Sequence, residues 1–427
     1  MTLIQLTPGT GGMYCGSCLR DHALVTALRK RGHQALMVPL YLPLALEEAD
    51  PPADAPIFFS GVNVYLEQKL PWFRGAPRWL HEWLASPKLL KWAAGKAAKT
   101  RPEELGELTL SMLRGEQGNQ AREVEELLDW LKQHEKPDAV CLSNSMLVGL
   151  VRRIKTELRV PVLCSLQGED AFLDALPEAT RASCWQTLGE RAREVDLFVA
   201  PSRYYAELMA RRLAVPLDRV RVVYNGIDLA GYAPAAEPPE PPVLGFFARL
   251  CREKGLDTLV EAFIALRRRD QVKDLKLRVG GTCTPADEPF VNSLRDRLKA
   301  QGLLGSVEFH PNLDRAAKQT FLRSLSALCV PALYGEAFGL YVIEALASGV
   351  PVVQPRHAAF PELIEATGGG ALYEPGNLSA LVQQLEDLLL NPILARSLGT
   401  AGRKAVLEKF SVDSMAQEMV KTIQEVL

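Results

Sequence analysis

Short apolar runs alternate with longer helical patterns along most of the chain. In the first half, each run is bounded by polar, glycine or proline residues, which is typical of buried β-strands. The strands predicted for this half are Leu3–Leu6, Ala35–Val38, Asp138–Leu142, Val162–Ser165 and Leu197–Ala200. Because strands that alternate with helices form right-handed βαβ units, the pattern predicts an α/β fold with a parallel sheet.

The same alternation restarts after residues 237–242, a segment that holds four prolines. Such a segment forms neither a helix nor a central strand, so we interpret it as a surface connector. The strands predicted beyond it are Val243–Phe247, Lys276–Val279, Val307–Phe309, Ala327–Val330 and Val350–Val353. We therefore expect two α/β domains, residues 1–200 and 201–410, and a helix at 411–427 that crosses back to the first domain.

Residues of about 69–130 do not follow the alternation and predict a helical insertion in the first domain. The insertion contains five of the six tryptophans: Trp72, Trp79, Trp83, Trp92 and Trp130. Residues 69–101 also hold eight lysines and arginines against one acidic residue. Two interpretations stay open. The helices pack on the first domain with their tryptophans buried, or they form a peripheral membrane patch that presents a lipid-linked acceptor.

Composition and charge restrict the class of protein. The chain has 427 residues, of which 48% are hydrophobic and 23% charged, as in an ordinary globular protein of two or three domains. The net charge of −2 excludes a global field that attracts nucleic acid. Without a basic leader or a run of about 18 apolar residues, we expect neither a signal peptide nor a membrane-spanning helix. The expected location is the cytoplasm, and only the membrane-patch interpretation of residues 69–101 adds peripheral contact at the inner membrane face.

Most of the eight cysteines lie in apolar runs, which favours small buried side chains in a reducing compartment over a disulfide framework. Cys15 and Cys18 form a Cys-x-x-Cys pair. A zinc site needs two more ligands, and the chain has no second pair of this kind. We therefore interpret the pair as small residues that shape a wall of the site, and we expect no metal.

The first motif that carries chemistry is Gly9-Thr10-Gly11-Gly12, directly after the first predicted strand. Glycines at this place allow the backbone to approach a phosphate, and the following helix offers free N–H groups at its start. The spacing is not that of a dinucleotide-binding Gly-x-Gly-x-x-Gly motif. A tight turn without a ligand explains the glycines equally well.

The second motif is a basic loop after the first strand of the second half, with Arg249 and Lys254. Cations on a short loop at the carboxyl end of a strand can bind a diphosphate and stabilise the charge that develops as it leaves. The alternative is a solvated basic turn.

The third motif, residues 331–345, follows a strand and opens a helix, and it is the most specific of the three. Glu336 and Glu344 are separated by seven residues. We expect Glu344 to lie two turns along a helix from Glu336, so that both carboxylates face one ligand and accept hydrogen bonds from sugar hydroxyls. N–H groups at Ala337–Leu340 would meet sugar or phosphate oxygens. Solvated glutamates are a poor alternative, since the rest of this helix is apolar.

Together these motifs resemble the large family-four retaining glycosyltransferases of the GT-B fold. The residues that carry the resemblance are Gly11-Gly12, Pro201-Ser202, Asn225-Gly226-Ile227-Asp228, Arg249, Lys254, Glu336, Glu344 and Gly349-Val350-Pro351-Val352. The resemblance implies two Rossmann-like domains that face each other across a cleft, an acceptor-side domain first and a nucleotide-sugar-binding domain second. It also implies metal-independent transfer of a hexose-type sugar, with retention, from a nucleotide diphosphate sugar that serves as co-substrate, and no other cofactor.

The resemblance also implies roles for single residues. The donor-binding residues would be Gly11, Gly12, Asn225, Arg249, Lys254, Glu336, Phe338, Gly339, Leu340 and Glu344. Among them, Arg249 and Lys254 would hold the diphosphate, Glu344 the ribose and Glu336 the donor sugar, and the residues implied as catalytic are Glu336, Arg249 and Lys254.

Two positions depart from the family pattern. Ala248 stands where a glycine usually precedes the arginine, and Gln167 stands where a histidine often lies near the donor sugar. Gln167 and Asp170 are assigned to the side of the acceptor and the donor sugar. The departure at Gln167 leaves the identity of the donor sugar open.

The expected acceptor is a glycan, a lipid-linked molecule or a small molecule. Two alternatives come from other classes. A nucleotide-sugar 2-epimerase on a similar fold would isomerise the donor without an acceptor, but it needs an acid/base pair at the sugar, and the sequence shows no evident one. A non-catalytic nucleotide-sugar-binding protein would bind the donor without turnover, and the presence of Arg249, Lys254 and both glutamates counts against it.

Overall fold

The computed structural model describes residues 1–9, 16–41, 102–133 and 136–427. The chain folds into two compact units. Unit 1 comprises Met1–Tyr224 and Met415–Leu427, and unit 2 comprises Asn225–Ser414. The tryptophan-rich stretch 69–101 lies outside the described residues, so neither interpretation of it is tested.

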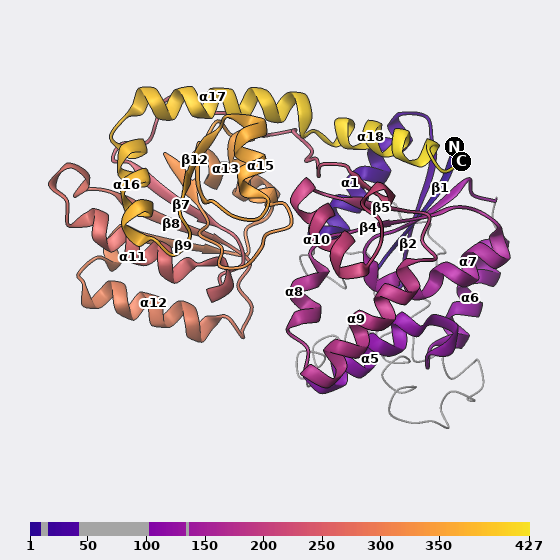
Figure 1. The fold of residues 1–427 in the computed structure, drawn as a ribbon. Coiled ribbons are helices and arrows are strands. Elements are labelled where there is room, and N and C mark those ends of the chain that lie inside the picture. Colours follow the sequence, from indigo (N-terminus) through magenta and orange to yellow (C-terminus); the bar gives the residue numbers. More distant parts are fainter. Residues whose placement is uncertain (10–15, 42–101, 134–135) are drawn as a thin grey trace. The chain divides into compact units, whose positions relative to one another are not determined.

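Within its described residues, unit 1 is built on a six-stranded parallel sheet with the strand order β2-β1-β3-β4-β5-β6 (Figure 1). The strands are β1 (Thr2–Thr7), β2 (Gln34–Pro39), β3 (Ala139–Leu142), β4 (Val162–Ser165), β5 (Leu197–Ala200) and β6 (Val220–Val222). Each strand predicted from an apolar run of the first half is present. β6 was not predicted, because its three residues include a central arginine and form no apolar run.

The boundary between the units lies after Tyr224, later than the boundary at 200/201 placed from the sequence. The reason is the strand β6, whose Val220 pairs in parallel with Phe198 of β5. Hydrogen bonding across this last strand pair, together with the helix α10 (Arg203–Leu213) between β5 and β6, extends the first unit beyond Ala200.

Helices connect and cover the strands of unit 1 (Figure 1). They are α1 (Gly16–Lys30), α5 (Pro102–Arg114), α6 (Ala121–Lys132), α7 (Val151–Leu158), α8 (Glu169–Asp174), α9 (Glu178–Ala192) and α10, with the 3₁₀ turns η2 (Gly115–Gln117), η3 (Ser145–Leu150) and η4 (Leu217–Arg219). The described part of the predicted insertion is helical and packs closely on α9. A Cβ on Gly106 of α5 would lie 2.4 Å from Oγ1 of Thr180. Residues 102–132 therefore belong to the body of unit 1.

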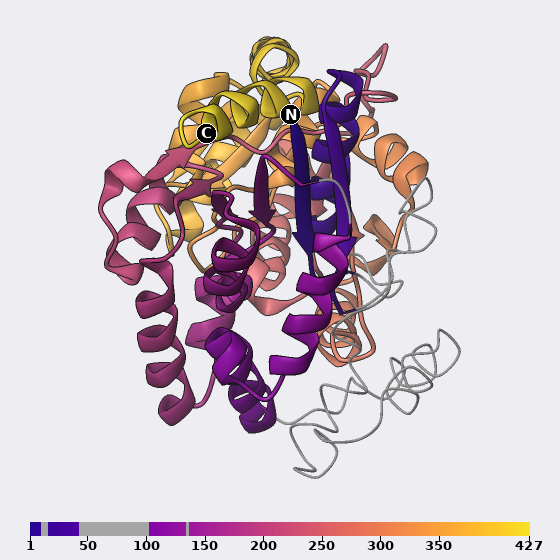
Figure 2. The same cartoon turned by 90° about the vertical axis from the view of Figure 1, so that its right-hand side faces the viewer.

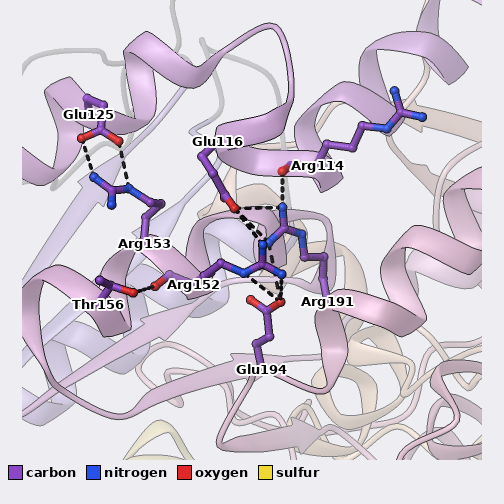
Figure 3. A network of polar contacts seen from close by, with 8 residues as sticks. All are labelled: Arg114, Glu116, Glu125, Arg152, Arg153, Thr156, Arg191 and Glu194. Atoms are coloured by element: carbon purple, nitrogen blue, oxygen red, sulfur yellow. Dashed lines mark hydrogen bonds and ion pairs between the residues drawn. The ribbon is translucent and has the colours of Figure 1, made fainter.

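A network of ion pairs joins η2, α7 and α9 (Figure 3). Arg191 is buried, and it donates to Oε1 of Glu116 at 3.3 Å and to the backbone carbonyl of Arg114. Arg152 binds Oε1 of Glu194 at 2.5 Å and Oε1 of Glu116 at 3.1 Å. Since desolvation of the buried Arg191 offsets much of the attraction, and exposed ion pairs contribute little, we expect the network to add little net stability.

The last helix, α18 (Val412–Gln424), belongs to unit 1 from Met415 onward. In unit 1 it lies near the N-terminal strand in both views (Figures 1 and 2). Met419 and Ile423 meet Leu3 and Leu24 around one small apolar cavity. Apolar burial on β1 and α1 therefore holds the C-terminal helix in this unit.

Unit 2 has a second six-stranded parallel sheet, with the order β12-β11-β10-β7-β8-β9, in residues that are all described. Its strands are β7 (Val243–Phe247), β8 (Lys276–Gly281), β9 (Val307–Pro311), β10 (Ala327–Cys329), β11 (Val352–Pro355) and β12 (Gly370–Tyr373). The predicted strands of the second half are all found. β12 was missed because it starts within a glycine run that resembles a loop. Gly370 is needed there, since a Cβ would lie 2.3 Å from the carbonyl oxygen of Val352.

The helices of unit 2 follow the strands in turn (Figure 1). They are α11 (Leu256–Arg267), α12 (Glu288–Ala300), α13 (Arg315–Arg323), α14 (Leu340–Ala347), α15 (Phe360–Thr367), α16 (Leu378–Leu389) and α17 (Pro392–Lys409), with the 3₁₀ turns η5 (Arg252–Lys254), η6 (Asp270–Val272) and η7 (Leu304–Ser306). In parallel α/β sheets the loops at the carboxyl ends of the strands form ligand sites. Here the loops after β7 and β10 carry the second and third motifs.

Within the described ranges, no helix is long and apolar enough to span a membrane, and no group of three His, Cys, Asp or Glu side chains could hold a metal ion. None of the described cysteines forms a disulfide. Cys18, Cys141, Cys164, Cys184 and Cys329 are buried, in agreement with the prediction that they pack as small apolar side chains. Cys15 lies outside the described residues.

Candidate functional site

The basic loop after β7 is held against the loop after β10 by backbone contacts. Gly255 ends η5 in the left-handed region, with φ of 72°, and a Cβ there would lie 1.9 Å from the carbonyl oxygen of Pro331. The backbone N–H of Leu333 donates to the carbonyl of Glu253 at 2.9 Å. A glycine is therefore required where the two loops meet, and this contact brings the second and third motifs together.

Lys254 and Glu336 form an ion pair across the two loops. The Nζ atom of Lys254 lies 2.5 Å from Oε2 of Glu336, and the hydroxyl of Tyr341 donates to the same oxygen at 3.1 Å. The side chains of Lys254 and Glu336 are only 16% and 15% exposed. Burial lowers the pKa of Lys254, but the charge of Glu336 and the contact with Tyr334 outweigh burial and raise that pKa. The raised pKa keeps the Lys254 side chain positively charged at neutral pH.

Arg249 of the same loop is held by a carboxylate that the sequence did not indicate. Its Nη2 and Nε atoms donate to the two oxygens of Asp287 at 3.0 and 3.3 Å. Asp287 is buried and also accepts from the N–H and hydroxyl of Thr284. The side chain of Arg249 stays 54% exposed. A guanidinium has five N–H donors, so most of them remain for a ligand.

The helix α14 begins at Leu340, and the structure corrects the expected position of Glu336. Glu336 lies in the loop before the helix, and Glu344 lies on the helix, so the two do not sit two turns apart on one helix. The change of direction occurs at Gly339, the N-cap, which has φ of 98°. Phe338 is buried and packs on Phe410, with ring centroids 6.1 Å apart, so the part that Phe338 offers to a ligand is its backbone.

Glu344 has a lysine and a tyrosine of its own. The Nζ atom of Lys318 on α13 lies 2.5 Å from Oε1 of Glu344, and the hydroxyl of Tyr232 donates to the same oxygen at 3.1 Å. The side chains of Lys318 and Glu344 are 12% and 10% exposed. Burial, then the charge of Glu344, raises the pKa of Tyr232. Sequence reasoning missed both partners, because neither lies in a motif.

The Asn225–Asp228 motif has a structural part. A Cβ on Gly226 would lie 2.2 Å from the carbonyl oxygen of Ser411, so the glycine allows two backbone segments to touch. Asp228 binds Nη2 of Arg315, at the start of α13, at 2.6 Å. Asn225 is buried. The motif thus attaches residues 226–228 to Ser411 and to α13 within unit 2. A donor contact by Asn225 stays a prediction.

In unit 1, Gln167 and Asp170 flank a buried carboxylate. Glu169 accepts from the backbone N–H groups of Ser145 and Gln167, both at 2.7 Å, and burial raises the pKa of Glu169. The hydroxyl of Tyr205 lies 3.1 Å from Oε2 of Glu169 and 2.8 Å from Oδ1 of Asp170. Glu169 therefore ties the loops after β3 and β4 together through the backbone N–H groups of Ser145 and Gln167. Glu169 stands directly before Asp170 in the sequence, and this pair of adjacent acidic residues could have indicated that Glu169 belongs to the site.

Gly11 and Gly12 lie outside the described residues, so their predicted role at the diphosphate is untested. In unit 2 the structure brings Lys254 into contact with Glu336. It gives Arg249 and Glu344 separate partners, Asp287 and Lys318. The loops at the carboxyl ends of the strands thus carry cations, carboxylates and the start of a helix. Such a set can bind a ligand that carries both phosphates and hydroxyls.

Residues 98–230 match the family described as Glycosyltransferase Family 4. Residues 233–405 match the family described as Glycosyl transferases group 1. The chain therefore belongs to the family-four glycosyltransferases. The second match contains the basic loop and both glutamates of the third motif, so the resemblance read from those residues is confirmed.

Curated relatives are similar to the chain over part of their length. The MMP alpha-(1->4)-mannosyltransferase of Mycolicibacterium hassiacum is 28% identical over 238 residues, which are 55% of this chain and 56% of that protein. The D-inositol 3-phosphate glycosyltransferase of Arthrobacter sp. is 28% identical over 328 residues, which are 72% of this chain and 73% of that protein. The chain therefore spans between about half and three quarters of the length of these relatives.

Solved structures confirm the fold class. A sucrose-phosphate synthase from Thermosynechococcus elongatus superposes with a TM-score of 0.72 at 18% identity, covering 100% of this chain and 99% of that one. Anabaena HepE in complex with UDP-glucose superposes with a TM-score of 0.67 at 16% identity, covering 100% of both chains. At such identities the likeness is one of fold, and the two Rossmann-like units are those of the GT-B fold.

Proposed function

We propose that the protein is a retaining glycosyltransferase that moves a hexose-type sugar from a nucleotide diphosphate sugar to a glycan, lipid-linked or small-molecule acceptor. The observation that carries the proposal is the buried contact between Lys254 and Glu336, at 2.5 Å, in a chain that belongs to this family. A cation for the leaving diphosphate and a carboxylate for the sugar hydroxyls stand side by side where the reacting bond would lie.

In the proposed reaction the basic loop stabilises the leaving group. As the bond between sugar and diphosphate breaks, negative charge develops on the diphosphate, and cations that are already in place stabilise it without reorganisation. Lys254 and the exposed N–H groups of Arg249 are these cations. The family resemblance supports a reaction in which they replace a metal ion.

The remaining contacts orient the donor. Glu336 would accept hydrogen bonds from the sugar, and Glu344 from the nucleotide ribose. The backbone N–H groups of Gly339 and Leu340 stand at the N-cap and in the first turn of α14, directly after Phe338, where the helix dipole favours anions. These groups would bind oxygens of the donor.

Nucleotide sugars are expected to stabilise the wild-type protein against thermal unfolding. A ligand at 100 times its dissociation constant raises the free energy of unfolding by about 2.7 kcal/mol, because it binds only the folded state. The measurement is a thermal-shift screen over UDP-, GDP- and ADP-sugars, with the free sugars as the matched control. If no nucleotide sugar stabilises the protein, the proposed class of donor is wrong. Otherwise, the ligand that raises the unfolding temperature most identifies the nucleotide of the donor.

The product is expected to keep the anomeric configuration of the donor. We expect the departing diphosphate oxygen to help deprotonate the acceptor hydroxyl on the same face of the sugar, so that the new bond forms where the old one breaks. NMR coupling constants of the anomeric proton in the product, compared with those in the donor, measure the configuration. An inverted product would exclude this course of the reaction.

A further inference from the structure

The proposed donor site has an electrostatic difficulty. Glu336 and Glu344 both lie beside the place proposed for a diphosphate, which itself carries negative charge. Like charges in a partly buried site repel strongly, since the effective dielectric constant there is far below that of water. Two uncompensated carboxylates would therefore weaken the binding of the ligand that they are meant to orient.

The structure compensates each carboxylate with one lysine. Glu336 pairs with Lys254, which belongs to the basic loop. Glu344 pairs with Lys318, which comes from α13 and lies outside every motif singled out in the sequence. Each of the two carboxylates also accepts from a tyrosine hydroxyl, that of Tyr341 or Tyr232. The Glu344 carboxylate thus contacts a lysine and a tyrosine hydroxyl, as the Glu336 carboxylate does, although Lys318 is far from the basic loop in sequence.

The contacts of Glu344 leave one of its oxygens for a ligand. Lys318, at 2.5 Å, and the hydroxyl of Tyr232, at 3.1 Å, both bind Oε1. Among the described residues no hydrogen bond is made to Oε2, and the side chain keeps 10% of its surface exposed. A carboxylate oxygen accepts about two hydrogen bonds, so Oε2 can accept from a vicinal diol such as that of ribose.

The loop before β7 holds α13 in the position that Lys318 needs. Arg315, one turn before Lys318, binds Oδ2 of Asp228 at 2.6 Å, and Nε2 of Gln319 donates to the carbonyl of Ala230 at 2.7 Å. This loop also supplies Tyr232. The lysine and the tyrosine that contact Glu344 are therefore fixed by one set of contacts.

We propose that Lys318 is a positioning residue that neutralises Glu344 and directs its free carboxylate oxygen to the ribose of a nucleoside diphosphate. The inference rests on the proposed function and adds to it a residue that acts through Glu344. Lys318 could otherwise bind phosphate directly, or it could only support α13 against α14. These three roles differ in what happens to the preference for ribose when the lysine is removed.

The test is a calorimetric titration of wild type and Lys318→Met with UDP, GDP and ADP, and with the 2′-deoxy form of the diphosphate that binds. We expect wild type to prefer the ribose form by about tenfold or more, as for a hydrogen bond to a charged group. In Lys318→Met this ratio is expected to fall toward one. Lys404→Met, an exposed lysine of α17, is the matched control and should keep both affinities.

Each other outcome has a definite meaning. Equal weakening of both ligands in Lys318→Met, with an unchanged ratio, would show a direct phosphate contact and overturn the inference. Unchanged affinities, or a wild type that binds without preference for ribose, would overturn it as well while leaving the proposed function intact. Failure of wild type to bind any of the three diphosphates would instead contradict the proposed function.

A second measurement covers the case in which Lys318→Met is too unstable for the titration. Removing one partner of a buried ion pair leaves an uncompensated charge, which destabilises the protein. Lys318→Met with Glu344→Gln contains no such charge, so its thermal unfolding temperature is expected to lie above that of Lys318→Met alone. If the added Glu344→Gln brings no recovery, Lys318 does not compensate Glu344, and the inference is wrong.

Discussion

Lys254→Ala and Arg249→Ala are each expected to lower the turnover of the donor by on the order of 100-fold or more. The physical reason is the loss of a cation aimed at the charge that develops on the leaving diphosphate, and single donors of this kind contribute about 10²–10³ in rate. The rate is measured as release of nucleoside diphosphate from the nucleotide sugar that gives the largest thermal shift. Arg252→Ala, in the same loop, is the matched control, since its side chain is 71% exposed and has no assigned role.

The two variants are expected to differ in stability. Removal of the exposed Arg249 leaves the buried Asp287 carboxylate with the N–H and hydroxyl of Thr284 as hydrogen-bond donors, so we expect only a small loss of stability. Lys254 is different, because it is buried against Glu336 and its removal leaves that carboxylate without a cation. Full activity in Arg249→Ala and Lys254→Ala would remove the assignment of the basic loop. A Lys254→Ala protein as stable as wild type would show that the Glu336 carboxylate tolerates the loss of the cation.

Gly255→Ala is expected to lower the free energy of unfolding by about 3 kcal/mol or more and to weaken nucleotide binding. Two costs combine at this position. The residue has φ of 72°, which disfavours any side chain, and the new Cβ would lie 1.9 Å from the carbonyl oxygen of Pro331. The clash can be relieved only if the basic loop moves away from the loop that carries Glu336. Denaturant unfolding and calorimetric titration with the bound diphosphate measure the two effects.

Gly302→Ala separates the two costs. Gly302 has φ of 69°, but no atom lies within 4 Å of the place its Cβ would take. Only the backbone cost of about 1–2 kcal/mol should appear there, with no effect on nucleotide binding. Equal losses of stability in the two variants would mean that the contact between Gly255 and Pro331 does not hold the loops together.

Most of the fold could be predicted from local patterns. Strands buried on both faces are continuous apolar runs, and both sheets consist largely of such runs, from Leu3–Leu6 to Val350–Val353. The strands that escaped prediction, β6 and β12, lie at sheet edges and are short, and most of their residues are only partly buried. Their sequences carry an arginine in one case and a glycine run before the other. Missing β6 also displaced the predicted boundary between the units.

The candidate site could be predicted only where its residues lie close together in sequence. Arg249 and Lys254 share a loop, and Glu336 and Glu344 share a motif. Their partners could not be found in this way, because each comes from a different βαβ unit. Asp287 precedes α12 and Lys318 lies on α13. Both reach the site only because the loops after neighbouring strands meet at the carboxyl ends of the sheet.

By itself the sequence determined the α/β class, the two sheets, the family and the four charged residues of the donor motifs, because apolar periodicity and short motifs are local properties of the chain. Only the tertiary structure decided that Gly255 brings Lys254 against Glu336, that Asp287 holds Arg249 and that Lys318 neutralises Glu344. Those pairings join residues that are distant in sequence, and a buried charge takes its partner from whatever the fold places within hydrogen-bond distance.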